Sequence, residues 1–554
     1  MKMKKKSYAI FLVLLLAMST FLAACGGGGN DSKEKGGSGG EGSDKSDNVL
    51  NLTETQDIPS MDSALATDTV SFTTLNSTME GLYRLGKDDE AVDGVADGEP
   101  QVSEDGKTWT FKLRDAKWSN GEPVTANDFV FAWRKALDPN TAAEYAYIMY
   151  DIKNAQAVNE GKMKPEELGV KAVNDKTLEV QLQNPVPYFK ELLTFGTFLP
   201  QNEKYVKEQG DKYGLEADTT LYNGPFILDQ WKHEDKFVLK KNPNYWDADT
   251  VKLNQINTKI VKDTQTDVNL FESGDADLIK LSSEFVDKYR ENEGFFTVKE
   301  SSVFFIRMNQ TKSEWLKNVD ARKAIAMGFD KKGITDVLLN NGSVVADFFV
   351  PEEFAKGPDG KDFRESAGKY LKTNTKEAKK HWEAAKKAIG QDTVTLELLN
   401  YDDDLSKKVG EYIKEELEKN LDGLTVNLKQ QPFKQKLDLE TKMDYQMSLG
   451  GWGADYLDPM TYLDMYVTGG AHNQQGFSNK EYDKLIQEGK TTLLLEPEKR
   501  WEALIKAEKI LLEDEAAIAP MYQRSRAYLE NPKLEGVLFH KVGPERSYKW
   551  AEFK

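Results

Sequence analysis

The sequence predicts a large α/β protein that contains several sheets. Strands are indicated where apolar and polar side chains alternate between turn residues, as in residues 107–113, which follow the turn pair Asp105-Gly106. Helices are indicated between such segments by apolar residues spaced three and four positions apart. In residues 393–428 a strand, a helix and a second strand follow one another, which is typical of a parallel βαβ unit with a right-handed crossover.

The N-terminus has the three parts of a secretory leader. Four lysines fall among the first six residues, an apolar core runs from Ala9 to about Met18, and small residues precede Cys25. The apolar run is too short for a stable transmembrane helix, which needs about 20 apolar residues. We therefore expect residues 1–24 to be a cleavable signal peptide.

Cys25 is the only cysteine of the 554 residues, and it ends the stretch Leu22-Ala23-Ala24-Cys25. A chance cysteine after a leader is one interpretation. The sharper interpretation is that these four residues resemble a bacterial lipobox, which implies lipidation of Cys25. Acyl chains would then anchor the protein at the extracytoplasmic face of the cell membrane, as in Gram-positive bacteria. A lone cysteine also excludes an intramolecular disulfide.

A flexible tether is predicted after this cysteine. Residues 26–48 contain no hydrophobic side chain, so they cannot bury enough surface to offset the entropy of becoming ordered. A coil of this Gly/Ser-rich composition spans about 25–30 Å on average. Together with Cys25, it forms a segment 25–48 that would let a folded body stand off a membrane.

Three further segments of the body carry clear signals. Residues 177–182 alternate apolar and polar side chains, and the apolar residues 237–239 precede a turn at Asn242, so both are predicted strands. Apolar residues between Trp501 and Leu511 recur at helical spacing. They predict an amphipathic helix that is entered through Pro497.

Composition favours a folded extracellular body and excludes some partners. The chain is 39% hydrophobic with ten tryptophans, which supports a substantial core, and its length suggests about three domains. The formal charge is −18, and loss of the four leader lysines takes it to −22. An acidic surface of this kind argues against a nucleic-acid partner.

A search for catalytic or metal-binding motifs finds none. The four histidines are His233, His381, His472 and His540, and no two of them stand at a metal-ligand spacing. Nucleotide-binding glycine fingerprints and a nucleophile elbow are also missing, so we expect neither a cofactor nor a metal. A glycosidase needs only two carboxylates, and a secreted glycoside hydrolase therefore remains a competing hypothesis.

Three stretches of the body resemble a known family. They are residues 103–129, residues 223–226 with the following 242–246, and residues 450–459. The first reads as a hairpin, a loop and a helix, while in the second Gly224 suits a positive φ or a close backbone approach. In this order they resemble the oligopeptide- and dipeptide-binding lipoproteins of ABC importers, family 5 of the extracellular solute-binding proteins.

The resemblance implies a type II periplasmic-binding-protein fold from about residue 49 onward, with two hinged lobes and an additional inserted domain. Domain I would combine residues 49–80, 206–302 and 523–554, domain II would be the insert 81–205, and domain III would cover 303–522. Closure of the lobes about a hinge would bury a ligand between them.

The family implies a binding protein and not an enzyme. We expect a monomer that captures oligopeptides between its lobes and delivers them to the permease subunits of an ABC transporter. Backbone hydrogen bonds hold the peptide in such proteins, and hydrated pockets tolerate different side chains. The same fold also serves relatives that bind nickel complexes or haem, so a non-peptide solute stays open as the alternative.

The site implied by the resemblance centres on Asp455, which would form an ion pair with the α-ammonium group of the peptide. Small residues flank Trp452, so another backbone can approach an unpaired strand edge there. We therefore expect peptide contacts from Gly451, Trp452, Gly453, Ala454 and Asp455. The same resemblance adds Tyr147, Thr67, Thr69 and Phe433 to the predicted ligand-binding residues.

The other end of the peptide is where the sequence departs from the family. The positions at which relatives carry basic residues for the peptide carboxylate correspond here to Ser406, Glu440 and Leu449, and none is cationic. Either Arg524 or Lys442 takes over, or the carboxylate reaches solvent. We therefore expect the site to require a free peptide amine and to tolerate changes at the peptide carboxylate.

Overall fold

The computed structural model describes residues 48–470 and 472–554, and the side chains of residues 433 and 434 are outside this description. The predicted signal peptide, Cys25 and nearly all of the predicted tether therefore lie outside the described residues. Among the described helices, none combines the length and the apolar content needed to cross a bilayer.

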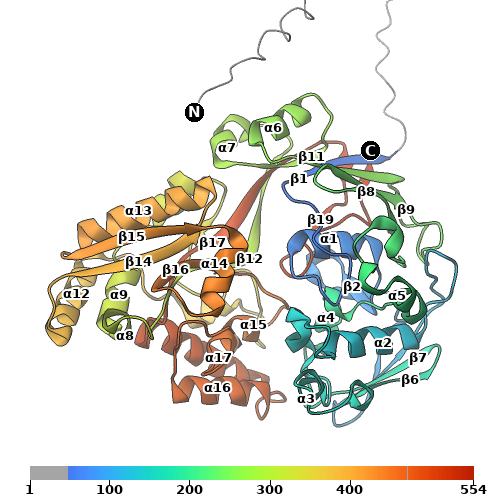
Figure 1. The fold of residues 1–554 in the computed structure, drawn as a ribbon, viewed down its shortest axis with the longest axis horizontal. Helices are drawn as coiled ribbons and strands as arrows, with labels where there is room; N and C mark the ends of the chain where they lie inside the picture. Colours follow the sequence, from blue (N-terminus) through green and yellow to red (C-terminus); the bar gives the residue numbers. More distant parts are fainter. Residues whose placement is uncertain (1–47, 471) are drawn as a thin grey trace, which may run out of the picture. The chain divides into compact units, whose positions relative to one another are not determined.

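One large mixed sheet runs through the described body (Figure 1). Its strands follow the order β15-β14-β16-β12-β17-β11-β1-β10-β9-β8, and β13 pairs with β17 off this path. Their bounds are β1 (Val49–Glu54), β8 (Phe226–Lys232), β9 (Lys236–Lys241), β10 (Gln255–Ile260), β11 (Leu278–Leu281), β12 (Phe295–Met308), β13 (Val344–Val345), β14 (Val394–Tyr401), β15 (Leu424–Gln431), β16 (Met447–Trp452) and β17 (Ile518–Glu530).

Two long antiparallel strands join the two ends of this sheet. β12 has 14 residues and β17 has 13, and they pair from Phe295 opposite Leu529 to Arg307 opposite Ile518. Figure 1 shows both strands running between two groups of helices. The register of the pair shifts between Lys299 and Val303, and such irregularities bend and twist strands locally.

The first group of elements surrounds a four-stranded sheet of order β4-β5-β7-β6. Its strands are β4 (Gln101–Val102), β5 (Thr108–Lys112), β6 (Val170–Asn174) and β7 (Thr177–Gln181), and its helices are α1 (Thr69–Thr78), α2 (Ala126–Leu137), α3 (Ala155–Asn159), α4 (Phe189–Leu192) and α5 (Glu203–Gln209). Helix α2 packs on this sheet and buries Trp133 completely. The predicted hairpin, loop and helix of residues 103–129 are confirmed, as are the strands predicted at 107–113 and 177–182.

A close approach explains Gly224, which precedes β8. A β-carbon at this position would lie 2.5 Å from the backbone at Thr78 and Met79, where α1 ends. Of the two roles predicted for this glycine, the close backbone approach is therefore the correct one. The contact fixes the end of α1 against the start of β8.

The second group is built on the predicted βαβ unit. Strands β14 and β15 are parallel, from Val394 opposite Leu424 onward, and α13 (Asp404–Asn420) connects them, so the prediction is confirmed. Gly423 has a φ of +84°, which suits the turn that starts the second strand. The other helices of this group are α8 (Glu314–Lys317), α9 (Val319–Met327), α10 (Lys331–Gly333), α11 (Phe363–Ala367), α12 (Thr375–Ile389), α14 (Phe433–Thr441), α15 (Met460–Leu463), α16 (Lys480–Lys490) and α17 (Pro497–Lys509).

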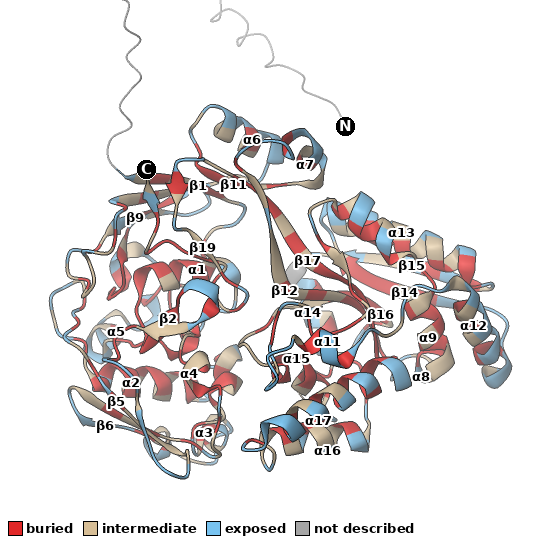
Figure 2. Cartoon of the chain, turned by 180° about the vertical axis from the view of Figure 1, so that it is seen from behind, coloured by how far each residue is buried: buried red, intermediate tan, exposed pale blue. Residues whose placement is uncertain are grey.

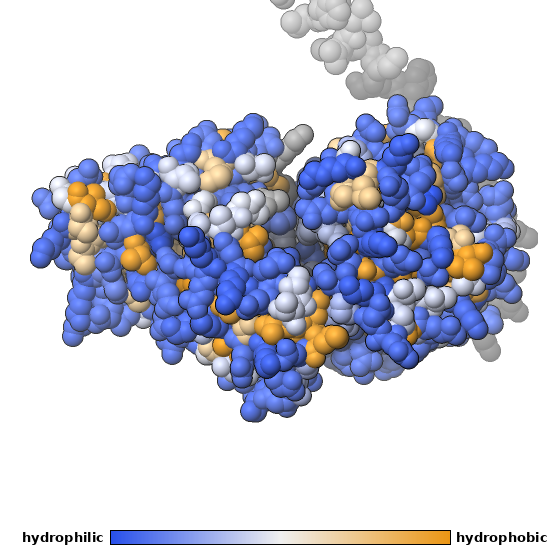
Figure 3. All heavy atoms as spheres, turned by 90° about the horizontal axis from the view of Figure 1, so that it is seen from below, coloured by the Kyte–Doolittle hydropathy of each residue, from blue (hydrophilic) through white to orange (hydrophobic). Residues whose placement is uncertain are grey.

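The remaining short elements complete the body. They are α6 (Thr264–Glu272) and α7 (Ser283–Tyr289) beside β11, and the strands β2 (Tyr83–Leu85), β3 (Ala91–Asp93), β18 (Leu534–Glu535), β19 (Leu538–Phe539), β20 (Arg546–Ser547) and β21 (Glu552–Phe553). Helix α17 begins at Pro497, as predicted. Figure 2 shows buried positions concentrated on β14, β16 and β17, and Figure 3 shows a mostly hydrophilic outer face with small apolar groups.

Candidate functional site: a cleft with a buried carboxyl group

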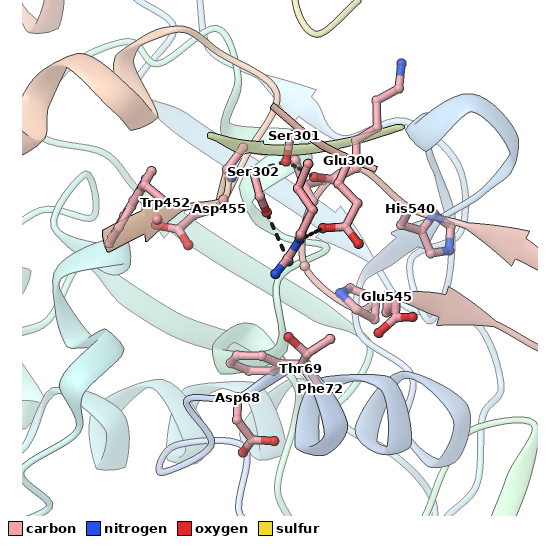
Figure 4. Close-up of a pocket in the computed structure, with 18 of the residues that line it drawn as sticks. Asp68, Thr69, Phe72, Glu300, Ser301, Ser302, Trp452, Asp455, His540 and Glu545 are labelled. Atoms are coloured by element: carbon pink, nitrogen blue, oxygen red, sulfur yellow. Dashed lines mark hydrogen bonds and ion pairs between the residues drawn. The ribbon is translucent and has the colours of Figure 1, made fainter. Parts of the chain in front are cut away.

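A cavity of about 370 Å³ lies where the long strands of the sheet meet the first turn of α1. Most of its wall comes from β12, the end of β16 with the residues that follow it, β17, and the segment 539–545, and the start of α1, Tyr145, Phe195 and Tyr401 complete it. Figure 4 shows Asp455 and Trp452 on one side of this cavity and Glu300, Glu545 and His540 on the other. We call this cavity the cleft.

Strand β16 leaves one of its edges open beside the cleft. It pairs with β12 along its whole length, up to Val303 opposite Trp452, but with β14 at only Met447 and Ser448. The backbone from Leu449 to Trp452 therefore has a strand partner on one side alone, as far as the described residues go. An unpaired edge presents N–H and C=O groups that an extended chain can pair with.

Glycines let this strand end pack closely against β12. A β-carbon at Gly451 would lie 2.9 Å from the ring of Phe304, and one at Gly453 would lie 3.0 Å from the hydroxyl oxygen of Ser302. Ala454 is buried, and its N–H donates to the Ser301 hydroxyl over 3.3 Å. The close packing of β12 is thus enough to require small residues in this stretch, with or without a ligand beside them.

Asp455 presents a carboxyl group to the cleft without a cationic partner among the described residues. The hydroxyl group of Tyr147 donates to its Oδ2 over 2.9 Å, and its backbone N–H donates to the hydroxyl of Thr461 over 3.1 Å. Burial raises the pKa of Asp455 to about 7; the negative charge of Asp464 adds to this, while hydrogen bonds from Tyr147 and Tyr145 oppose it. A cation placed in the cleft would stabilise the ionised form.

Aromatic rings surround this carboxyl group. The ring of His472 lies 4.9 Å from that of Trp452 and 5.2 Å from that of Tyr147, between ring centroids. Burial lowers the pKa of His472, so the neutral imidazole is favoured. The Trp452 indole N–H donates to the carbonyl of Thr461 over 3.0 Å, which fixes the ring in the wall.

Arginines define the other side of the cleft. Arg524 and Arg526 alternate along β17, so both face the same side of the sheet. The carboxylate of Glu300 bridges them: Arg524 Nε lies 2.6 Å from its Oε2, and Arg526 Nε lies 2.5 Å from its Oε1. Arg524 also approaches the Ser302 hydroxyl, at 3.4 Å. Its guanidinium is therefore already partly neutralised before any ligand arrives.

A Ser–His–Asp trio stands in the wall but presents no exposed nucleophile. His540 Nδ1 lies 2.9 Å from Asp89 Oδ1, and its Nε2 lies 2.7 Å from the hydroxyl oxygen of Ser547. The residue Ser547 is 0% exposed, and its hydroxyl also accepts from the Asn76 side chain over 2.7 Å. These contacts tie the segment 539–545 to α1 and leave no room for a solute at the serine.

The structure brings most of the predicted site residues together. The cleft is lined by Thr67, Thr69, Gly451, Trp452, Gly453, Ala454 and Asp455. Tyr147 reaches the cleft through its hydrogen bond to Asp455. Phe433 starts α14, but its side chain is outside the described part of the chain, and so is Cys25.

The positions considered for the peptide carboxylate are spread apart. Arg524 lines the cleft, whereas Lys442 is exposed at the end of α14 and lines no part of it. Ser406 and Leu449 line a neighbouring cavity. Glu440 is buried, and its carboxylate lies 2.8 Å from the Lys436 ammonium and 2.7 Å from the Ser448 hydroxyl.

Several cleft residues were not predicted. Tyr145, Glu300 and the pair Ser301-Ser302 line it, as does the segment 539–545. The two serines that precede the apolar run 303–306 were a usable signal for the irregularity in β12, and Gly543-Pro544 marks a turn. The chain carries no comparable local signal for Tyr145.

Comparisons with known proteins agree with this architecture. The sequence profile of the bacterial extracellular solute-binding proteins, family 5 Middle, matches residues 90–474. A protein named dipeptide-binding protein DppE, from Bacillus subtilis, is 35% identical over 539 residues, which cover 97% of this chain and 98% of that protein.

Solved structures give the same result. The substrate-binding domain of an oligopeptide ABC transporter from Bacillus anthracis is 54% identical, with a TM-score of 0.84, over 91% of this chain and 98% of that one. Listeria monocytogenes OppA bound to peptide is 45% identical, with a TM-score of 0.83, over 92% and 99% of the two chains. The predicted type II periplasmic-binding-protein fold is thereby confirmed. The chain belongs to the family 5 bacterial extracellular solute-binding proteins.

Proposed function

We propose that this protein captures short peptides in the cleft and delivers them to an ABC-type importer. The observation that carries this proposal is the carboxyl group of Asp455, which lies without a cationic partner among the described residues, beside the open edge of β16. A peptide supplies both missing partners, an ammonium group and an extended backbone. The similar proteins named as dipeptide-binding or solved with bound peptide support the same conclusion.

The peptide amine is recognised by Asp455. An ammonium group at this position ionises the carboxyl, and the low polarity of the aromatic wall strengthens the resulting ion pair. Arg524 is the cation that meets the peptide carboxylate. Because Glu300 already pairs with Arg524, a carboxylate gains less there than the amine gains at Asp455.

Closure of two lobes holds the peptide. We propose the division anticipated from the sequence: domain I from residues 49–80, 206–302 and 523–554, the insert 81–205, and domain III from residues 303–522. Contacts between the insert and domain III support this. The rings of Tyr188 and Tyr456 stack at 5.0 Å, and the guanidinium of Arg500 lies 5.6 Å from the Tyr188 ring. The register shift in β12 near Lys299 supplies a place for the hinge.

Anchoring follows from the N-terminal sequence. Residues 1–24 act as a signal peptide, and lipidation of Cys25 holds the protein at the outer face of the cell membrane as a tethered monomer. The protein binds its solute without converting it. The buried serine of the Ser547–His540–Asp89 trio supports this, since its hydroxyl is out of reach of a solute in the cleft.

Calorimetry on one peptide in free, N-acetylated and C-amidated forms tests the proposal. Acetylation removes the ammonium group and should weaken binding at least about a hundredfold, as should Asp455→Ala, because breaking a buried pair costs about 3–5 kcal/mol. Amidation should cost less. The control is Asp444→Ala, which removes an exposed carboxylate that pairs with Lys312.

The outcomes separate the alternatives. If amidation costs more than acetylation, the two ends of the site are assigned the wrong way round. If no peptide binds, the protein is not a peptide receptor. Mass spectrometry of the solute that co-purifies with the protein would then identify a nickel complex, haem or another cargo.

A further inference from the structure

A second cavity opens beside the cleft and shares part of its wall. Its volume is about 310 Å³, and Phe304, Tyr401 and Arg524 line both cavities. The rest of its lining comes from the end of β14, the start of α13, the strands β16 and β17, and the turn of helix Ile334–Leu339. The position of this second cavity makes it a branch of the cleft.

The interior of this branch is apolar. Five lining residues are less than a tenth exposed and carry aliphatic or aromatic side chains: Leu339, Val409, Leu449, Met521 and Tyr522. The rings of Phe304 and Tyr522 stack face to face, with centroids 4.9 Å apart, and form one wall.

Polar groups lie at the rim and already have partners. Asp403 caps α13 by accepting the backbone N–H of Ser406 over 2.9 Å. The side-chain amide of Asn400 donates to the carbonyl of Ser406. The guanidinium of Arg524 pairs with Glu300. A polar group that entered this branch would lose its hydrogen bonds to water and form few new ones. An apolar group would instead gain free energy from burial.

We propose that this branch is a selective subsite for one aliphatic or aromatic side chain of the bound peptide. The inference rests on the proposed peptide-binding function and adds a preference to it. An apolar pocket discriminates between side chains by size and polarity, unlike a hydrated pocket in which water fills the gaps. The protein should therefore select among peptides by one position of their sequence.

The register of β16 places the subsite beyond the second peptide residue. Phe304, at the mouth, pairs with Gly451, four residues before Asp455, and Leu449 lies six residues before it. An extended chain advances about 3.3 Å per residue, and β16 ends at Trp452, so these positions lie at most roughly 13 and 20 Å from Asp455. A peptide held at Asp455 by its amine presents residues three to six, and not the first two, to the branch.

A leucine scan through an alanine hexapeptide tests this. Each peptide carries one leucine, at positions one to six in turn, and its dissociation constant for the protein is measured by calorimetry. We expect one position between three and six at which leucine strengthens binding about ten- to a hundredfold over the all-alanine peptide. At positions one and two the change should stay below about threefold.

Variants at the rim connect the preference to this branch. Ser406→Phe places a ring in the cavity while its backbone N–H can still cap α13, and Leu405→Asp adds a charge to a residue that is 39% exposed at the mouth. Both should reduce the leucine-to-alanine ratio at the preferred position below about threefold. The matched control is Leu437→Asp on α14, where the leucine is 40% exposed and lines neither cavity. This control should keep the full ratio.

Each result decides a different point. Uniform affinities across the scan, or a preference at position one or two, would overturn the subsite. So would a preference that survives both Ser406→Phe and Leu405→Asp in variants whose melting temperatures show that they fold. If none of the hexapeptides binds the wild-type protein, peptide capture itself is refuted, and the subsite with it.

Discussion

Lowering the pH from 7.5 to 5.5 should weaken peptide binding through Asp455. In the empty cleft, burial raises the pKa of this carboxyl to about 7. At pH 5.5 it is protonated, and a neutral carboxyl cannot form an ion pair with the peptide ammonium. The group must then lose its proton before the peptide is held, and the free energy of that step is subtracted from the binding free energy.

The size of the effect follows from the ionised fraction. With a pKa of about 7 the fraction rises from about 3% at pH 5.5 to about 75% at pH 7.5, so the affinity should rise about 25-fold. Above pH 8 the peptide amine, whose pKa is about 7.7–8.0, begins to lose its own proton. The affinity should therefore pass through a maximum between about pH 7 and 8.

Calorimetry in buffers with different heats of ionisation measures both affinity and proton release. At pH 7 binding should release about half a proton, because about half of the empty protein carries a protonated Asp455. The variant Asp455→Asn should bind weakly with little pH dependence, and any slope that remains would belong to His472. Wild-type affinity that is flat between pH 5.5 and 7.5, or stronger at pH 5.5, would refute the argument.

Three further predictions concern stability, closure and anchoring. Burial raises the folded-state pKa of Asp455 from 3.8 to about 7, so this group contributes less stability as pH rises through that range. Asp455→Asn should therefore stabilise the empty protein at pH 8 by about 4 kcal/mol, and calorimetric melting of both proteins at pH 5 and 8 checks this. Tyr188→Ala removes the stack on Tyr456 and should weaken peptide binding about fivefold, mainly through faster dissociation in stopped-flow measurements, whereas Tyr188→Phe should keep wild-type rates. Cys25→Ser should abolish lipidation and release the protein to the medium with unchanged peptide affinity, and equal partitioning of both forms into detergent would contradict this.

Local sequence patterns predict the elements that depend on short-range spacing. The βαβ unit is an example: alternating apolar residues predict β14 and β15, and apolar residues at helical spacing between them predict α13. The helix that begins at Pro497 is another. In both cases the residues that carry the sequence pattern are the residues that form the element. The pattern can therefore be interpreted without knowing a partner far away in the chain.

The assembly of the cleft could not be predicted in the same way. Arg524 and Glu300 are 224 positions apart, and only the pairing of β17 with β12 brings them together. The open edge of β16 depends on where β14 stops pairing, which no residue in β16 itself reveals. Asp455 was found through family resemblance, whereas the apolar branch needs side chains from five separate segments.

The open edge of β16 also bears on the solubility of the protein. Unpaired strand edges are templates for association between molecules, and proteins protect them. Here the edge lies in a recess of about 370 Å³, which suits a single extended chain but not the sheet of a second molecule. The recess that receives the ligand therefore also shields the empty protein from edge-to-edge aggregation. Conditions that hold the lobes apart should expose this edge and promote such aggregation.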